Sequence, residues 1–157
     1  MAFDATSSPE VLLHATRKSP LLLCACCLIA VRHYSLEAAQ NLAPLLFEKA
    51  KSLLSSALLY SSQRIEFFQA AIVLCMWSTT VGQNPLGIDS WLVSGFALQH
   101  CFSTKLFQPL VSSSTTPFSQ SRQHLDRLRV FNHLVLVHLQ YVLAIQELVG
   151  SNNVQTG

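Results

Sequence analysis

Cysteine is the residue type with the greatest chemical potential in this 157-residue sequence, and three of its five cysteines lie within four positions. Cys24 and Cys27 have the C-x-x-C spacing of redox and metal sites, with Cys26 between them. A redox pair of this type is expected at a helix N-terminus after a strand, where the thiolate is stabilised. Here the motif falls in the second turn of an apolar segment with no strand pattern before it. We therefore interpret these three residues, like Cys75 and Cys101, as buried thiols of a reducing compartment.

A zinc site would need four ligands in paired spacings, and Cys24, Cys27 and His33 supply only three candidates. His133 and His138 are five residues apart, which places them about 140° apart around a helix. That separation excludes the same-face pair of an H-E-x-x-H site. The remaining histidines stand alone in the sequence, and we interpret them as hydrogen-bonded structural residues: His14, His33, His100 and His124. We therefore predict no metal ligand and no cofactor in this chain.

Residues for acid, base or nucleophilic catalysis are not grouped in the sequence. Val93-Ser94-Gly95-Phe96 lacks the first glycine of a G-x-S-x-G nucleophile elbow and lies within a predicted helix. No two of the eight carboxylates are close enough in sequence to suggest an acid and base pair. Glycine-rich phosphate loops are missing from the sequence. We therefore predict no enzymatic activity and no catalytic residue.

Two tryptophans and three arginines could bind a ligand. Trp77 and Trp91 flank a central turn, where they would line a small-molecule pocket or, in the interpretation we favour, fill the core. The arginines near the last predicted helix could contact phosphate, but we favour a solvated basic face that pairs with Asp126 and Glu147. These arginines are Arg122, Arg127 and Arg129.

The composition is apolar and poor in charge. Half of the residues are hydrophobic and 11% are charged, against roughly 25% in ordinary soluble domains. Part of the surface is therefore expected to need a covering partner or further sequence. The net charge of +2 comes without a dense run of either sign, so we see no electrostatic footprint for nucleic acid or acidic lipid.

Membrane insertion and secretion are not favoured by the sequence. The longest apolar run, residues 21–31, is shorter than the ~20 residues that cross a bilayer. The N-terminus lacks the basic flank and apolar core of a secretory signal. We therefore favour a soluble intracellular protein, with a membrane-associated helical protein as the alternative.

Helical periodicity dominates the chain and predicts an all-α fold with about six helices in antiparallel pairs. The predicted helices span residues 9–16, 19–33, 36–59, 64–81, 90–106 and 124–149. Ser19 and Asp89 are placed as N-caps, and Pro20 suits the first helical position. Pro44 is expected to kink its helix or restart it near residue 43. Gly150 is expected to stop the last helix.

The two segments 64–81 and 90–106 are so apolar that we expect them to form the centre of the fold, joined by a turn at residues 82–87. The last helix is expected to direct one stripe of apolar residues toward the core. That stripe consists of Leu128, Phe131, Val135, Leu139, Val142 and Val149. No segment shows the alternation of a strand.

The domain organisation follows from these elements. Residues 1–18 are expected to be an N-terminal segment, partly disordered, and residues 150–157 a disordered tail. Between them, residues 19–149 are predicted to form one helical domain, which contains a Ser/Thr-rich loop at residues 108–123.

The order of the motifs in this domain resembles the fungal-specific transcription factor domain, the regulatory middle homology region found downstream of the fungal binuclear zinc cluster. Matching elements are Ser19-Pro20-Leu21-Leu22, Ala30-Val31-Arg32-His33, Phe47, Ala50, Leu53, Leu54, Gln69-Ala70, Leu74, Trp91, Gly95 and Ala97. The resemblance covers residues 19–144. A looser similarity to activators of secreted-protease genes rests on Pro44-Leu45-Leu46-Phe47, Leu53-Leu54-Ser55-Ser56, Asp89-Ser90-Trp91-Leu92, Phe131-Asn132-His133-Leu134 and His138-Leu139-Gln140-Tyr141.

Three departures from the family pattern bear on function. The G-L-H turn is replaced by residues 99–102, and the R-R-x-W-W element is reduced to residues 127–131. Nothing in the chain matches the C-x2-C-x6-C pattern of the zinc cluster that contacts DNA in such factors. Zinc is therefore expected only in a full-length relative, and this chain alone is not expected to bind DNA specifically.

The resemblance implies a nuclear regulatory domain, or a truncated piece of one, that controls transcription by RNA polymerase II through helix packing. Its expected partners are other parts of a parent transcription factor or the transcriptional machinery, with a small-molecule effector as a further possibility. Secreted-protease or nutrient-assimilation genes are the expected targets. A truncated piece is also expected to expose apolar helix faces.

Overall fold

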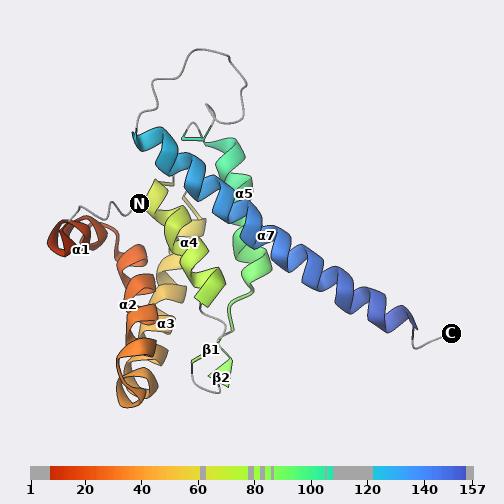
Figure 1. Cartoon of the computed structure of the whole chain (residues 1–157), viewed down its shortest axis with the longest axis horizontal. Coiled ribbons are helices and arrows are strands. Elements are labelled where there is room, and N and C mark those ends of the chain that lie inside the picture. The colour runs from red at the N-terminus through yellow and green to blue at the C-terminus, as the bar shows by residue number, and fades with distance from the viewer. Residues whose placement is uncertain are drawn as a thin grey trace, which may run out of the picture.

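The structure is a computed structural model, and its described residues are 8–60, 63–77, 80–81, 84–85, 87–104, 106–107 and 122–154. Within them the chain is helical except for one pair of two-residue strands (Figure 1). The elements are α1 (Pro9–Arg17), α2 (Pro20–Tyr34), α3 (Leu36–Leu58), α4 (Ile65–Trp77), β1 (Thr80–Val81), β2 (Asn84–Pro85), α5 (Ser90–Ser103) and α7 (Arg122–Val154). The predicted all-α fold of about six helices is confirmed.

Helices α2 and α3 form an antiparallel hairpin at one side of the molecule (Figure 1). As predicted, the Ser19 side chain caps α2 by accepting a hydrogen bond from the backbone N–H of Leu22 at 3.4 Å, with Pro20 at the first helical position. Ser35 is the single residue between the helices, and its extended backbone reverses the chain. Its side chain accepts from the N–H of Ala38 at 3.1 Å, so the same residue starts α3.

The predicted restart of the helix near Pro44 does not occur, because α3 is continuous from Leu36 to Leu58. Proline removes a backbone donor and leaves the carbonyl four residues earlier, here that of Gln40, without its helical partner. Both Pro44 and Gln40 lie on the exposed side of α3. Water can hydrate the freed carbonyl there, and the helix therefore continues through the proline.

Helix α4 is the centre of the fold, as its sequence predicted. Eight of its thirteen residues are buried, and it contacts α2, α5 and α7. Phe68 is fully buried and makes edge-to-face contacts with Phe67 and Phe107, at centroid distances of 5.3 Å and 5.0 Å. Such aromatic contacts add to the stabilisation from burial alone. An apolar helix of this kind is stable only when other helices surround it.

The turn predicted after α4 contains the minimal antiparallel pair β1 and β2, in which Thr80 faces Pro85 and Val81 faces Asn84. Strands of two residues are too short to show alternation, so no pattern of residues predicted them. After the turn, Asp89 caps α5 as predicted, with its carboxylate accepting from the N–H of Leu92 at 3.0 Å. The central helices are shorter than expected and end at Trp77 and Ser103.

Helix α7 runs to Val154, so the prediction that Gly150 stops it is wrong. Glycine is only about 1 kcal/mol less favourable than alanine inside a helix, which does not by itself end one. The predicted core stripe of α7 is wrong at Leu128 and Leu139, which are exposed, whereas Phe131 packs against the core as predicted. The buried apolar residues of α7 are Val130, Leu134 and Val137, which the predicted stripe did not include.

The C-terminal half of α7 projects beyond the other helices (Figure 1). It exposes Leu139, Leu143 and Ile145, which agrees with the expectation of an apolar helix face. By length and composition alone, residues 124–147 would suffice to cross a membrane, and this is the one such helix in the described part of the chain.

Several predictions of disorder fall outside the described residues. These concern residues 1–7, 108–121 and 155–157. Of the predicted N-terminal segment, residues 9–17 form α1.

Candidate functional site

The C-x-x-C segment lies on α2, where its environment disfavours thiolate. The Cys24 thiol is buried and donates a hydrogen bond to the backbone carbonyl of Leu46 at 3.1 Å. Burial raises the pKa of Cys24, with a smaller contribution from Cys27, and the same two causes raise the pKa of Cys26. Redox and metal-binding cysteines need the opposite shift. The cysteines of this segment therefore pack against neighbouring residues as protonated thiols.

The cysteines of α4 and α5 are fully buried, and burial raises the pKa of both Cys75 and Cys101 from 9.0 to about 12. All five cysteines are free thiols. Among the residues described by the structure, no three histidine, cysteine or acidic side chains come close enough together to hold a metal ion.

The C-terminal end of α4 is the point at which side chains from three other helices meet. Tyr141 of α7 donates its hydroxyl to the carbonyl of Cys75 at 2.6 Å, and Ser90 of α5 donates to the same oxygen at 3.4 Å. Arg32 of α2 donates to the carbonyl of Trp77. The last carbonyls of a helix have no intrahelical partner, so these three side chains satisfy groups that α4 leaves open. We call this region, with the adjoining contacts between α5 and α7, the α4 junction.

A serine and a histidine face each other in the α4 junction, although they are 44 residues apart in sequence. Ser94 of α5 is fully buried, and its Oγ lies 3.1 Å from Nδ1 of His138 on α7. The same hydroxyl donates to the carbonyl of Trp91 at 3.1 Å. A hydroxyl has one proton and a carbonyl can only accept, so the arrangement that satisfies both contacts has the Ser94 proton on the Trp91 carbonyl and His138 donating from Nδ1.

This direction of the hydrogen bond argues against nucleophilic catalysis at the Ser94–His138 pair. A general base must accept the proton of its nucleophile, whereas the imidazole of His138 donates its own. The hydroxyl of Ser94 is also enclosed, with no exposed surface from which it could reach a substrate. The pair therefore fixes the packing of α7 on α5.

Gly95 and Trp91 complete the contact between α5 and α7. A Cβ atom at Gly95 would lie 3.1 Å from Cε1 and 3.6 Å from Nδ1 of His138, so glycine leaves the room that the ring occupies. Trp91, four residues before Gly95 on α5, stacks on the ring of His138, with ring centroids 6.5 Å apart and planes 20° apart. Ala97, two residues after Gly95, is fully buried. The aromatic-x-x-x-G-x-A element thus has a packing role at this helix crossing.

The tryptophans do not fill the core, so the interpretation favoured from the sequence is wrong. Trp77 is 42% exposed and Trp91 is 45% exposed. Trp77 lies at the end of α4, where its backbone carbonyl accepts a hydrogen bond from Arg32. Trp91 lies at the start of α5, where its ring stacks on His138. The sequence of these helices did not predict that the two tryptophans would be exposed, because nearly every residue around them is apolar and no helical periodicity marks one side as the surface.

The other histidines and the arginines are spread over the surface. His14 and His33 are exposed, whereas the ring of His100 packs on Phe96 at 4.4 Å and its buried Nδ1 has no hydrogen-bond partner. His100 is therefore not the hydrogen-bonded residue that was predicted. Arg129 pairs with Asp126 at 3.9 Å, as expected for a solvated face. His124 and Arg127 are partly exposed, Glu147 is exposed, and the side chain of Arg122 lies outside the described residues.

His133 and His138 point to different neighbours, as their spacing predicted. His133 is exposed, and its Nδ1 lies 2.7 Å from the carbonyl of Arg129, to which it must donate. It lines a pocket of about 290 Å³ bounded by α1, α2, α4 and α7, which we call the α4–α7 pocket. Neither the pocket nor the position of Gln69 in it was recognised from the sequence, because the lining comes from four separate helices.

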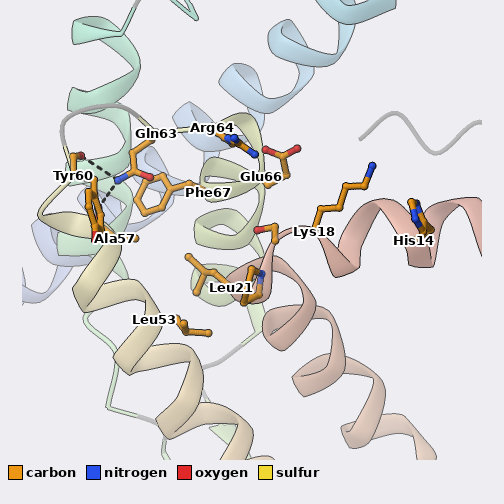
Figure 2. A pocket seen from close by; sticks show the side chains of 12 residues that line it. His14, Lys18, Leu21, Leu53, Ala57, Tyr60, Gln63, Arg64, Glu66 and Phe67 are labelled. Atoms are coloured by element: carbon orange, nitrogen blue, oxygen red, sulfur yellow. Dashed lines mark hydrogen bonds between the residues drawn. The ribbon is translucent and has the colours of Figure 1, made fainter.

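A larger pocket of about 670 Å³ lies where α1, α2, the end of α3 and the start of α4 meet (Figure 2). Its apolar lining includes Leu21, Leu53 and Phe67. Lys18, Arg64 and Glu66 bring charges of both signs to it. Gln63 closes one side by donating to the carbonyls of Ala57 and Tyr60, as the dashed lines in Figure 2 show.

The comparisons with known proteins place this chain among transcriptional regulators. Residues 1–152 match the model of the middle domain of the transcriptional activator of proteases prtT. The chain is 37% identical over 131 residues to an uncharacterized transcriptional regulatory protein of Schizosaccharomyces pombe, a match that covers 78% of this chain and 22% of that protein. It is 30% identical over 88 residues to the transcriptional activator of proteases prtT of Aspergillus clavatus, covering 55% of this chain and 14% of that protein.

The chain spans less than a quarter of the length of these curated relatives. No solved structure matches it. The family match extends over nearly the whole chain and agrees with the resemblance in motif order between residues 19 and 144. The chain belongs to the family of the prtT-like transcriptional activator middle domain.

Proposed function

We propose that this chain is the regulatory, non-DNA-contacting domain of a fungal Zn2Cys6-type transcription factor that controls transcription by RNA polymerase II in the nucleus. The observation that carries the proposal is the family match over residues 1–152. The missing C-x2-C-x6-C pattern and the low net charge of +2 support a role away from DNA. The prtT relative is an activator of proteases by name, which favours secreted-protease genes as targets.

The α4 junction provides a means by which such a domain could transmit a signal. Among the residues that the structure describes, the contacts of Tyr141 with Cys75 and of His138 with Ser94 tie helix α7 to the centre of the fold. A partner that binds the projecting half of α7 would act on both contacts at once. Coupling between distant sites requires an element with two arrangements, and we assign that part to α7.

A reporter assay tests the proposal. The full chain is fused to a heterologous DNA-binding domain without an activation region, and a reporter with the matching binding sites is measured in a fungal host. We expect reporter output to differ severalfold from that of the DNA-binding domain alone. Tyr141→Phe should reduce this difference, while Tyr34→Phe, at a residue that is 85% exposed, serves as the matched control.

The outcome that would overturn the proposal is reporter output equal to that of the DNA-binding domain alone, although the fusion accumulates in the nucleus to the same level. Immunoblotting and fluorescence imaging of the fusion establish that level. A fluorescent fusion of the full-length parent protein should also concentrate in the nucleus.

A membrane-associated helical protein is the second candidate, and the length and apolar composition of α7 favour it. Polar residues within the same segment, Asn132, His133, His138 and Gln140, count against it because each would be costly in lipid. Cell fractionation separates the two candidates. Retention of the chain in the membrane pellet after alkaline carbonate extraction would support membrane association.

A further inference from the structure

We draw no further inference here: the strongest candidate, the exposed apolar stripe of Leu136, Leu139 and Leu143 on α7, carries nothing because nothing in the described part of the chain shows what covers it.

Discussion

Substituting Gly95 with alanine should destabilise the domain, against the usual effect of this change in a helix. Alanine is favoured over glycine inside a helix by about 0.5–1 kcal/mol. At this position, however, the added Cβ would lie 3.1 Å from Cε1 of His138. The imidazole must move by a few tenths of an ångström, and this shift disturbs its hydrogen bond with Ser94 and its stacked contact with Trp91.

The magnitude follows from the contacts that the displaced ring would weaken. The Ser94–His138 hydrogen bond is worth about 0.5–1.5 kcal/mol, and the stacked contact with Trp91 contributes about 0.5–1.5 kcal/mol. Losing most of both costs about 2 kcal/mol, which exceeds the gain in helix propensity. We therefore expect Gly95→Ala to lower the free energy of unfolding by about 1 kcal/mol.

A double-mutant cycle with His138→Ala isolates the cause. Without the imidazole, the new Cβ of Gly95→Ala meets no obstacle, and the substitution should stabilise the chain by about 0.5–1 kcal/mol. The free energy of unfolding of all four proteins is measured by urea denaturation, followed by circular dichroism. Stabilisation by Gly95→Ala in both backgrounds, or a coupling energy near zero, would refute the assignment of Gly95 as the space for His138.

The remaining predictions concern hydrogen bonds and ionisation in the same region. Tyr141→Phe removes the donor to the Cys75 carbonyl and should lower the free energy of unfolding by about 1 kcal/mol, with Tyr34→Phe unchanged in the same urea experiment. Asp89→Ala should cost about 1 kcal/mol by removing the cap of α5, whereas Asp89→Asn should retain most of it; equal losses in the two variants would contradict the capping role. Burial raises the pKa of Cys75 from 9.0 to about 12. The buried, protonated thiol therefore contributes its full share to the free energy of unfolding below pH 9.0, and this contribution is lost as the pH rises from 9.0 to about 12. At about pH 10 this loss is about 1.4 kcal/mol, and Cys75→Ala should show a shallower decline of stability across that interval than the unaltered chain.

The parts of the fold that the sequence predicted well are those fixed by local chemistry. Ser19 and Asp89 were recognised as N-caps because a short polar side chain before an apolar helical run satisfies the free backbone donors within three residues. The central position of α4 followed from its apolar residues on every side. The motif order also led to the family that the comparisons confirmed.

Predictions failed where several local arrangements cost nearly the same. Pro44 and Gly150 each disfavour a helix by an amount that the surroundings can offset, so α3 and α7 continue through them. The buried stripe of α7 was misplaced because apolar residues occur on more than one side of this helix. Its contacts with α4 and α5 decide which side is buried.

The amino-acid sequence by itself determined the helical class, the caps and the family, since each depends on residues close together in the chain or on their order. Only the tertiary structure brought Ser94 to His138, Tyr141 to Cys75 and Gln69 to Arg129 in one pocket. These pairs are 44, 66 and 60 residues apart in the sequence. No local sequence pattern predicts these contacts. They depend on how α7 crosses α4 and α5, and that crossing is set by the packing of all the helices together.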